Sequence, residues 1–149
     1  MKKVLIAIEL SDDSAKFVLQ KAADACAKDV RVEVVHVVDP ASITYSIDPT
    51  MTGQIYQQMY EQTVANAQAR LTELCTPFGF SADQLHVRYG RVAHEIHELL
   101  VEGGFDTCMI GSHGHSGWQR VLGSKASSVL HGVPVDTWVF SLAPLLKVE

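Results

Sequence analysis

Short, mostly apolar runs alternate along the chain with longer segments whose apolar positions recur at the spacing of an amphipathic helix. The short runs predict strands at Lys3–Glu9, Arg31–Val38, Gln84–Tyr89, Thr107–Ile110 and Val135–Leu142. The longer segments predict helices at Asp12–Ala27, Gln54–Thr76, Arg91–Val101 and Trp118–Leu130. Apolar strands that alternate with helices are typical of an α/β fold whose parallel sheet is buried on both faces. We therefore expect an open five-stranded parallel sheet with helices on both faces.

The length of 149 residues fits a single domain, 1–149, large enough to bury about 70% of its unfolded surface. The formal net charge of -5 and the absence of a Lys/Arg cluster argue against nonspecific binding to nucleic acid. No apolar run approaches the roughly 20 residues that span a bilayer. The apolar run at the N-terminus is too short for a signal peptide and acidic residues follow it, so we expect a cytoplasmic protein.

Three cysteines, Cys26, Cys75 and Cys108, are widely spaced and form no C-x-x-C pair. Cys26 and Cys108 have apolar neighbours, so they are expected to be core thiols in a reducing compartment. Cys75 falls near the end of a predicted helix, where its thiol could be accessible and act in redox sensing.

The stretch Gly111–Gly117, followed by Gly123-Ser124-Lys125, connects a predicted strand to a predicted helix and is the strongest candidate for a binding site. Glycines let the backbone approach a phosphate, and the free N–H groups at a helix start point toward it. No Asp or Glu occurs from Gly111 to Lys125, whereas His113 and His115 could pair with an anion. The other interpretation is a purely structural turn, because neither a P-loop nor a G-x-G-x-x-G pattern is present.

Three predicted strands end in polar or glycine-containing segments, at Glu9-Leu10-Ser11, at Val37-Val38-Asp39 and at Ile110–Gly114. Ligands of open parallel sheets bind beyond the carboxyl ends of the strands, where the strand order reverses. The glycine-rich loop therefore lies where this fold class places a ligand.

A resemblance to a known family rests on three segments, Val4–Ser11, Val35–Asp39 and Gly111–Ser124. The chain resembles the universal stress proteins along essentially its whole length. The resemblance implies a Rossmann-like sheet and a homodimer formed through the last strand. One branch of that family binds ATP through G-x-x-G, nine further residues, and G-Ser/Thr. Another branch, similar to universal stress protein A, lacks these glycines and is not known for nucleotide binding.

The sequence is intermediate between these two branches. Gly111, Gly114, Gly123 and Ser124 match the ATP-binding pattern in type, but only eight residues separate Gly114 from Gly123. Glu9 stands where ATP-binding members usually carry Asp. Glutamate is one methylene longer than aspartate, so the carboxylate of Glu9 would lie farther out than the one that would contact a ribose or a cation in ATP-binding members.

The resemblance implies a nucleotide site at Ala7, Glu9, Val37, Ile110, Gly111, Gly114, Gly123, Ser124 and Lys125. In that site, adenine would lie against Ala7, Val37 and Ile110, and Glu9 would lie near the ribose or a cation. The two glycines of the loop would admit ribose and phosphates. The start of the last helix would hold the terminal phosphates, Lys125 adding its charge. Mg²⁺ would accompany ATP mainly through the phosphates, with no metal site of protein ligands.

The function implied is a dimeric nucleotide-binding module for signalling or stress adaptation; the alternative is a nucleotide-free dimeric interaction protein. No acid–base pair or Ser-His-Asp arrangement is evident, so we expect no enzyme activity beyond slow, incidental ATP hydrolysis. An adenylating enzyme would need glycines after the first strand, where this chain has Glu9–Asp13.

Two further segments carry predictions. His94-Glu95-Ile96-His97-Glu98 does not have the H-E-x-x-H spacing and is expected to be a solvated helix face with no metal. The last predicted strand places Trp138 and Phe140 on one face and Val139 on the other. A terminal strand with so many apolar residues would expose an apolar sheet edge unless another surface covered it. A second copy of the chain could do so, which favours a homodimer.

Overall fold

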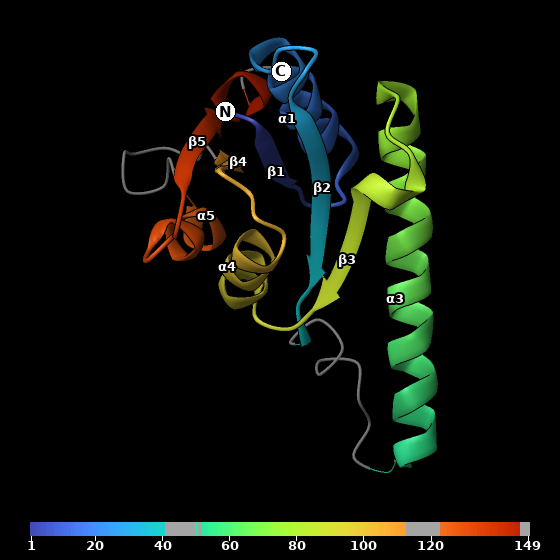
Figure 1. Cartoon of the computed structure of the whole chain (residues 1–149). Helices are drawn as coiled ribbons and strands as arrows, with labels where there is room; N and C mark the ends of the chain where they lie inside the picture. The colour runs from blue at the N-terminus through green and yellow to red at the C-terminus, as the bar shows by residue number, and fades with distance from the viewer. Residues whose placement is uncertain (41–49, 51, 113–122, 147–149) are drawn as a thin grey trace.

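Figure 1 shows the computed structural model of the chain. The structure describes residues 1–40, 50, 52–112 and 123–146. These residues form five parallel strands and four α-helices. The strands are β1 (Lys3–Ala7), β2 (Arg31–Val38), β3 (Leu85–Tyr89), β4 (Thr107–Ser112) and β5 (Asp136–Ser141). The helices are α1 (Asp12–Ala25), α3 (Gly53–Cys75), α4 (Val92–Glu102) and α5 (Gly123–Leu130). Short 3₁₀ turns are η1 (Thr76–Phe78), η2 (Ala82–Gln84) and η4 (Ala143–Leu146). The predicted α/β fold is confirmed.

The sheet has the strand order β3-β2-β1-β4-β5, and every pair of neighbours is parallel. The central strand β1 pairs Ile6 with Val34 of β2 on one side and with Met109 of β4 on the other. The strand order reverses at β1, and the chain later returns to add β4 next to it. The carboxyl ends of β1 and β4 therefore border the crevice where ligands of such sheets bind.

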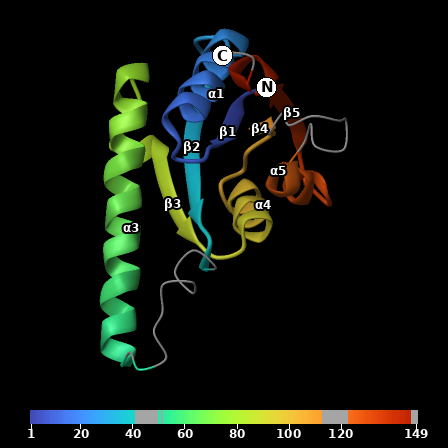
Figure 2. The same cartoon turned by 180° about the vertical axis from the view of Figure 1, so that it is seen from behind.

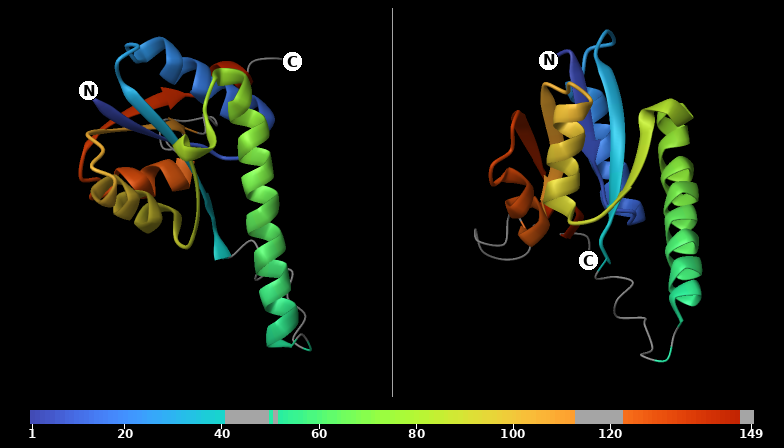
Figure 3. Two further views of the ribbon diagram at one scale, coloured as in Figure 1. Left: turned by 45° about the vertical axis from the view of Figure 1, so that its right-hand side comes forward. Right: turned by 60° about the horizontal axis from the view of Figure 1, so that its bottom comes forward.

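Helices cover both faces of the sheet: α1 and α3 one face, α4 and α5 the other (Figure 2, Figure 3). On the first face the core consists of Val4, Ile6, Val34 and Met109 with Val18, Leu19, Leu71 and Leu74. On the second face it consists of Leu5, Val35, Val37, Cys108 and Ile110 with Ile96, Leu99, Leu100, Ala126 and Val129. Neighbouring residues of each strand thus enter different cores, which explains why the strands are apolar throughout. Among the described helices, none combines the length and apolar character needed to cross a membrane.

The strand β5 lies at one edge of the sheet. Trp138 is 44% exposed, whereas Phe140 packs against the core beneath α1 and Val139 against the core beneath α4 and α5. The predicted alternation of Phe140 and Val139 between the two faces is confirmed. An exposed tryptophan on an unpaired strand edge is a feature that an oligomer interface would cover.

The prediction that Cys75 could be accessible is wrong. Cys75 is fully buried at the end of α3, one helical turn after Leu71 and beside Leu74, on the face that packs against the sheet. Burial raises the pKa of the Cys75 thiol to about 11. A thiol that stays protonated and inaccessible is not poised for redox sensing. Cys108 is buried as predicted, and Cys26 is partly exposed.

Element boundaries differ from prediction by a few residues near the cleft edge. The strand β1 ends at Ala7 and not at Glu9, whereas β4 continues through Gly111 and Ser112 because these residues pair with β5. The start predicted for the last helix, at Trp118, and the loop residues His113, Gly114 and His115 lie outside the described residues.

A stability prediction follows from Gly111. A Cβ added there would lie 2.8 Å from Cγ2 of Val18, a stiff side chain of α1, and near Leu142. We expect Gly111→Ala to lower the free energy of unfolding by about 1–3 kcal/mol, measured by urea denaturation. The matched control is Gly53→Ala at the first position of α3, where no atom lies within 4 Å and no loss is expected. Equal stability of both variants would contradict this explanation for Gly111.

Candidate nucleotide site

A cleft opens at the carboxyl edge of the sheet, in the crevice between β1 and β4. Its apolar walls include Ala7, Val35, Val37, Ile96, Ile110 and Ala126. Its polar lining includes Glu9, Ser14, His36 and Lys125. An apolar hollow with few polar groups at its border is typical of small-molecule sites.

Six of the nine predicted site residues line this one cleft: Ala7, Glu9, Val37, Ile110, Gly111 and Lys125. Gly123 and Ser124 are the first two residues of α5, immediately before Lys125. Gly114 lies outside the described residues. Residues from the first strand, the second strand and the fourth strand thus meet, because parallel strands bring their carboxyl ends to one edge.

Glu9 and Lys125 form an ion pair across the cleft, with Oε1 and Nζ 3.0 Å apart. The side chains are 37% and 54% exposed, so water screens the pair and it contributes little to stability. Each side chain can therefore exchange its partner for a charged or polar group of a ligand. The sequence suggested a ligand contact for each residue, but not their contact with one another.

His36 is a residue of the cleft that sequence reasoning missed. Its Nδ1–H donates to the carbonyl oxygen of Ile8 at 2.9 Å, because a carbonyl can only accept. Burial lowers the pKa of His36, and the charge of Lys125 acts in the same direction against the effects of Ile8 and Glu9. The imidazole is therefore neutral at pH 7. The available signal was a histidine between two pairs of valines, Val34-Val35 and Val37-Val38, near the end of β2.

The prediction of a solvated face on α4 holds for His94 but not for His97. His94 and Glu98 are exposed and lie 3.6 Å apart. The ligand atoms of His94, Glu95 and Glu98 lie within 4.8 Å of one another, and the predicted absence of a metal there remains a prediction. His97 is half-buried and donates from Nε2 to the carbonyl oxygen of Val129 at 2.6 Å. His97 therefore links α4 to α5.

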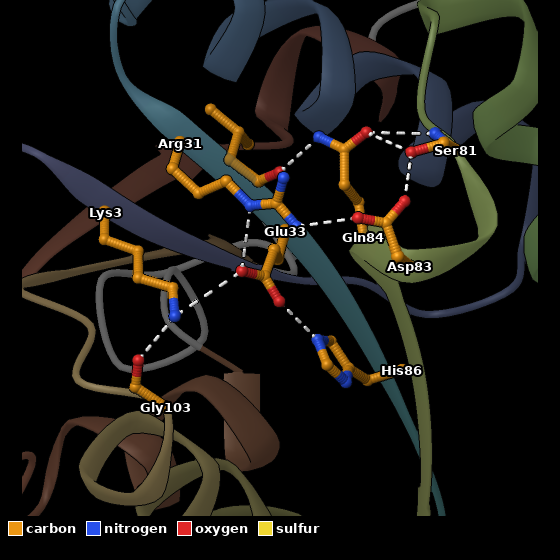
Figure 4. A network of polar contacts seen from close by, with 9 residues as sticks. Lys3, Arg31, Glu33, Ser81, Asp83, Gln84, His86 and Gly103 are labelled. Atoms are coloured by element: carbon orange, nitrogen blue, oxygen red, sulfur yellow. Dashed lines mark hydrogen bonds and ion pairs between the residues drawn. The ribbon is translucent and has the colours of Figure 1, made fainter.

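A polar network lies at the opposite, amino edge of the sheet (Figure 4). Its centre is Glu33, only 6% exposed, whose carboxylate meets Lys3 at 3.6 Å, Arg31 at 3.2 Å and His86 at 2.7 Å. Burial alone would raise the pKa of Glu33, but hydrogen bonds from His86 and Arg31 and the charge of Lys3 hold this pKa below its usual value. The network joins the first three strands in the sheet and lies away from the cleft.

Comparisons with known proteins point to one family. The profile of the universal stress protein family matches residues 1–141. Universal stress protein A homolog 1 of Coxiella burnetii is 31% identical over 136 residues, which cover 91% of this chain and 92% of that protein.

Two solved structures share the fold. The structure of hypothetical protein MJ0577 superposes with a TM-score of 0.73 at 19% identity and covers 93% of this chain and 94% of that one. A universal stress protein in complex with cAMP superposes with a TM-score of 0.55 at 20% identity, covering 94% and 96%.

Proposed function

Because the chain belongs to the universal stress protein family, we propose that it is a small nucleotide-binding module for signalling or stress adaptation. Its ligand is ATP with Mg²⁺, held in the cleft between β1 and β4. The observation that carries this proposal is that six of the nine residues predicted for a nucleotide site line one cleft.

The chemistry of the cleft fits the parts of a nucleotide. Ala7, Val37 and Ile110 provide apolar walls for a base. The Glu9 carboxylate can accept hydrogen bonds from ribose hydroxyls, and Lys125 can exchange Glu9 for a phosphate. Mg²⁺ would be held mainly by the phosphates, since it keeps most of its water and rarely uses an all-protein cage.

We propose that the protein does not act as an enzyme beyond slow, incidental hydrolysis. The polar groups described at the cleft are already paired within the protein: Glu9 with Lys125, His36 with Ile8, and Ser14 with Ser11. No nucleophile next to a general base occurs among them, and acyl or phosphoryl transfer through the protein would need such a pair.

The proposed assembly is a homodimer through β5, located in the cytoplasm, with no nucleic-acid partner. Trp138 exposed on the edge strand supports the dimer. The three free cysteines suit a reducing compartment. The net charge of -5 disfavours nucleic acid.

Thermal unfolding with and without millimolar Mg-ATP tests the proposal. A ligand that binds only the native state at 100 times its Kd stabilises by about 2.7 kcal/mol, so the midpoint should rise by about 5–10 °C. Ala7→Leu should abolish this rise, because the larger side chain extends into the cleft. Ala23→Leu, at an exposed position of α1, is the matched control and should retain it. Mg-AMP and cAMP belong in the same series, since one structural neighbour was solved with cAMP.

A second candidate is a nucleotide-free dimeric interaction protein. The Glu9–Lys125 pair favours it, because each charged side chain at the cleft has a partner without any ligand. A folded parent protein that shows no rise in unfolding midpoint with any nucleotide would establish this candidate over the first.

A further inference from the structure

A groove between α4 and α5, here called the α4–α5 groove, adjoins the cleft. Its lining includes Arg91, His94 and His97 on one side and Lys125, Ser128 and His131 on the other. Its volume is about 530 Å³. Val92 and Lys125 line both the cleft and the groove, so the two hollows are adjacent.

The groove is rich in hydrogen-bond donors of a kind that bind phosphate. Arginine presents a fork of N–H groups that matches two phosphate oxygens, and the imidazoles of His94 and His131 can each supply an N–H, whereas His97 already donates its Nε2–H to Val129. The acidic groups nearby are Asp39 in the lining, Glu9 on Lys125, and Glu98 at 3.6 Å from His94.

Arg91 differs from the other arginines of the described chain. Arg31, Arg70 and Arg88 each lie within 4 Å of carboxylates. The guanidinium of Arg91 has no ion pair or hydrogen bond among the described residues, although it is exposed at the first turn of α4. A guanidinium that borders a groove and has no partner among the described residues can bind an anion.

The groove is long enough for more than one phosphate. From Lys125, at the cleft, to His131 is a distance of about 9 Å along the axis of α5 at 1.5 Å per residue. The hydrogen bond from His97 to Val129 joins the two helices that border the groove. A unit that enters from the cleft can therefore contact Arg91 and Lys125 first and His131 farther along.

We propose that the α4–α5 groove binds a second phosphate-bearing unit of a nucleotide whose first unit lies in the cleft. The ligand class is a dinucleoside polyphosphate, and the inference rests on the proposed function of the cleft. A separate small anion is the weaker source, because a chain of net charge -5 attracts free anions poorly. A second unit that is covalently linked to the nucleotide in the cleft has a high effective concentration at the groove, so its binding does not depend on long-range electrostatic attraction.

Isothermal titration calorimetry with ADP, diadenosine tetraphosphate and pyrophosphate, each with Mg²⁺, tests this inference on the full chain. The dinucleotide should bind the parent at least about tenfold more tightly than ADP, the gain expected from one or two charge-assisted hydrogen bonds. Arg91→Ala together with His131→Ala should abolish that advantage and leave the affinity for ADP unchanged. Arg91→Lys should retain part of it. Lys28→Ala, which removes an exposed cation remote from the groove, should retain all of it.

The outcomes separate the groove from the cleft. Binding of ADP without a dinucleotide advantage would overturn the inference and leave the proposed function intact. Binding of pyrophosphate that depends on Arg91 would also overturn it, in favour of a separate anion. Absence of binding by both nucleotides, in a protein with unchanged circular dichroism, would overturn the inference together with the proposed function. Both substituted side chains are exposed, so the variants are expected to fold.

Discussion

Replacing Glu33 by alanine is expected to lower the free energy of unfolding by about 3 kcal/mol at pH 7. The substitution removes a carboxylate that is 6% exposed and leaves three donors around the space it vacates: Lys3, Arg31 and His86. The side chains of these three partners are 29–47% exposed, so they can turn toward water once the carboxylate is gone. The expected loss of stability is therefore at the low end of the range for a broken buried ion pair. Urea denaturation followed by circular dichroism measures the difference.

The pH dependence of that difference distinguishes a charge effect from a loss of packing. Because the pKa of Glu33 in the folded protein lies below its ordinary value of 4.5, its contribution to stability is complete above pH 4.5. The contribution is lost as the pH falls through the lowered pKa, so the parent and Glu33→Ala should converge in acid. Glu73→Ala is the control, since Glu73 is 71% exposed in its pair with Arg70 and should change stability little. A difference that stays constant into acid would contradict the role given to the charge.

Trp138→Glu is expected to weaken dimerisation at least about 30-fold, equivalent to about 2 kcal/mol. Trp138 is a large aromatic, 44% exposed, on the edge strand through which the proposed dimer forms. In a two-fold symmetric interface the substitution places two like charges in the contact, besides removing two aromatic side chains. Sedimentation velocity over a concentration series measures the effect.

Val101→Glu provides the matched control for Trp138→Glu. Val101 is 69% exposed near the end of α4, so the same charge is introduced at an apolar surface position away from β5. It should leave the monomer–dimer equilibrium unchanged. A parent that is monomeric at every concentration, or a Trp138→Glu variant that dimerises as the parent does, would show that β5 is not the interface.

Much of the fold could be predicted because the strands carry their own signal. The prediction for β2, Arg31–Val38, is correct at both ends, since an apolar run enclosed by polar residues and a following proline is a local pattern. The end of β4 could not be predicted, because Gly111 and Ser112 become strand only by pairing with β5. Local patterns do not specify a partner strand.

The candidate site divides in the same way. Glu9, Val37 and Ile110 could be located near one edge because each ends or follows an apolar run. The errors concern faces: Cys75 and His97 were assigned to accessible surfaces, yet each points toward a packed neighbour. Position near a helix end does not reveal which side of the helix the core will cover.

The sequence by itself determined the α/β class, the family and the edge of the sheet where the cleft lies, because the class follows from apolar periodicity and the other two follow from short motifs. Only the tertiary structure decided that Glu9 reaches Lys125, that His36 binds Ile8, and that Arg91 faces a groove beside the cleft. Such contacts join residues far apart in the chain. They depend on strand order and on how α4 and α5 pack, and no local pattern encodes either.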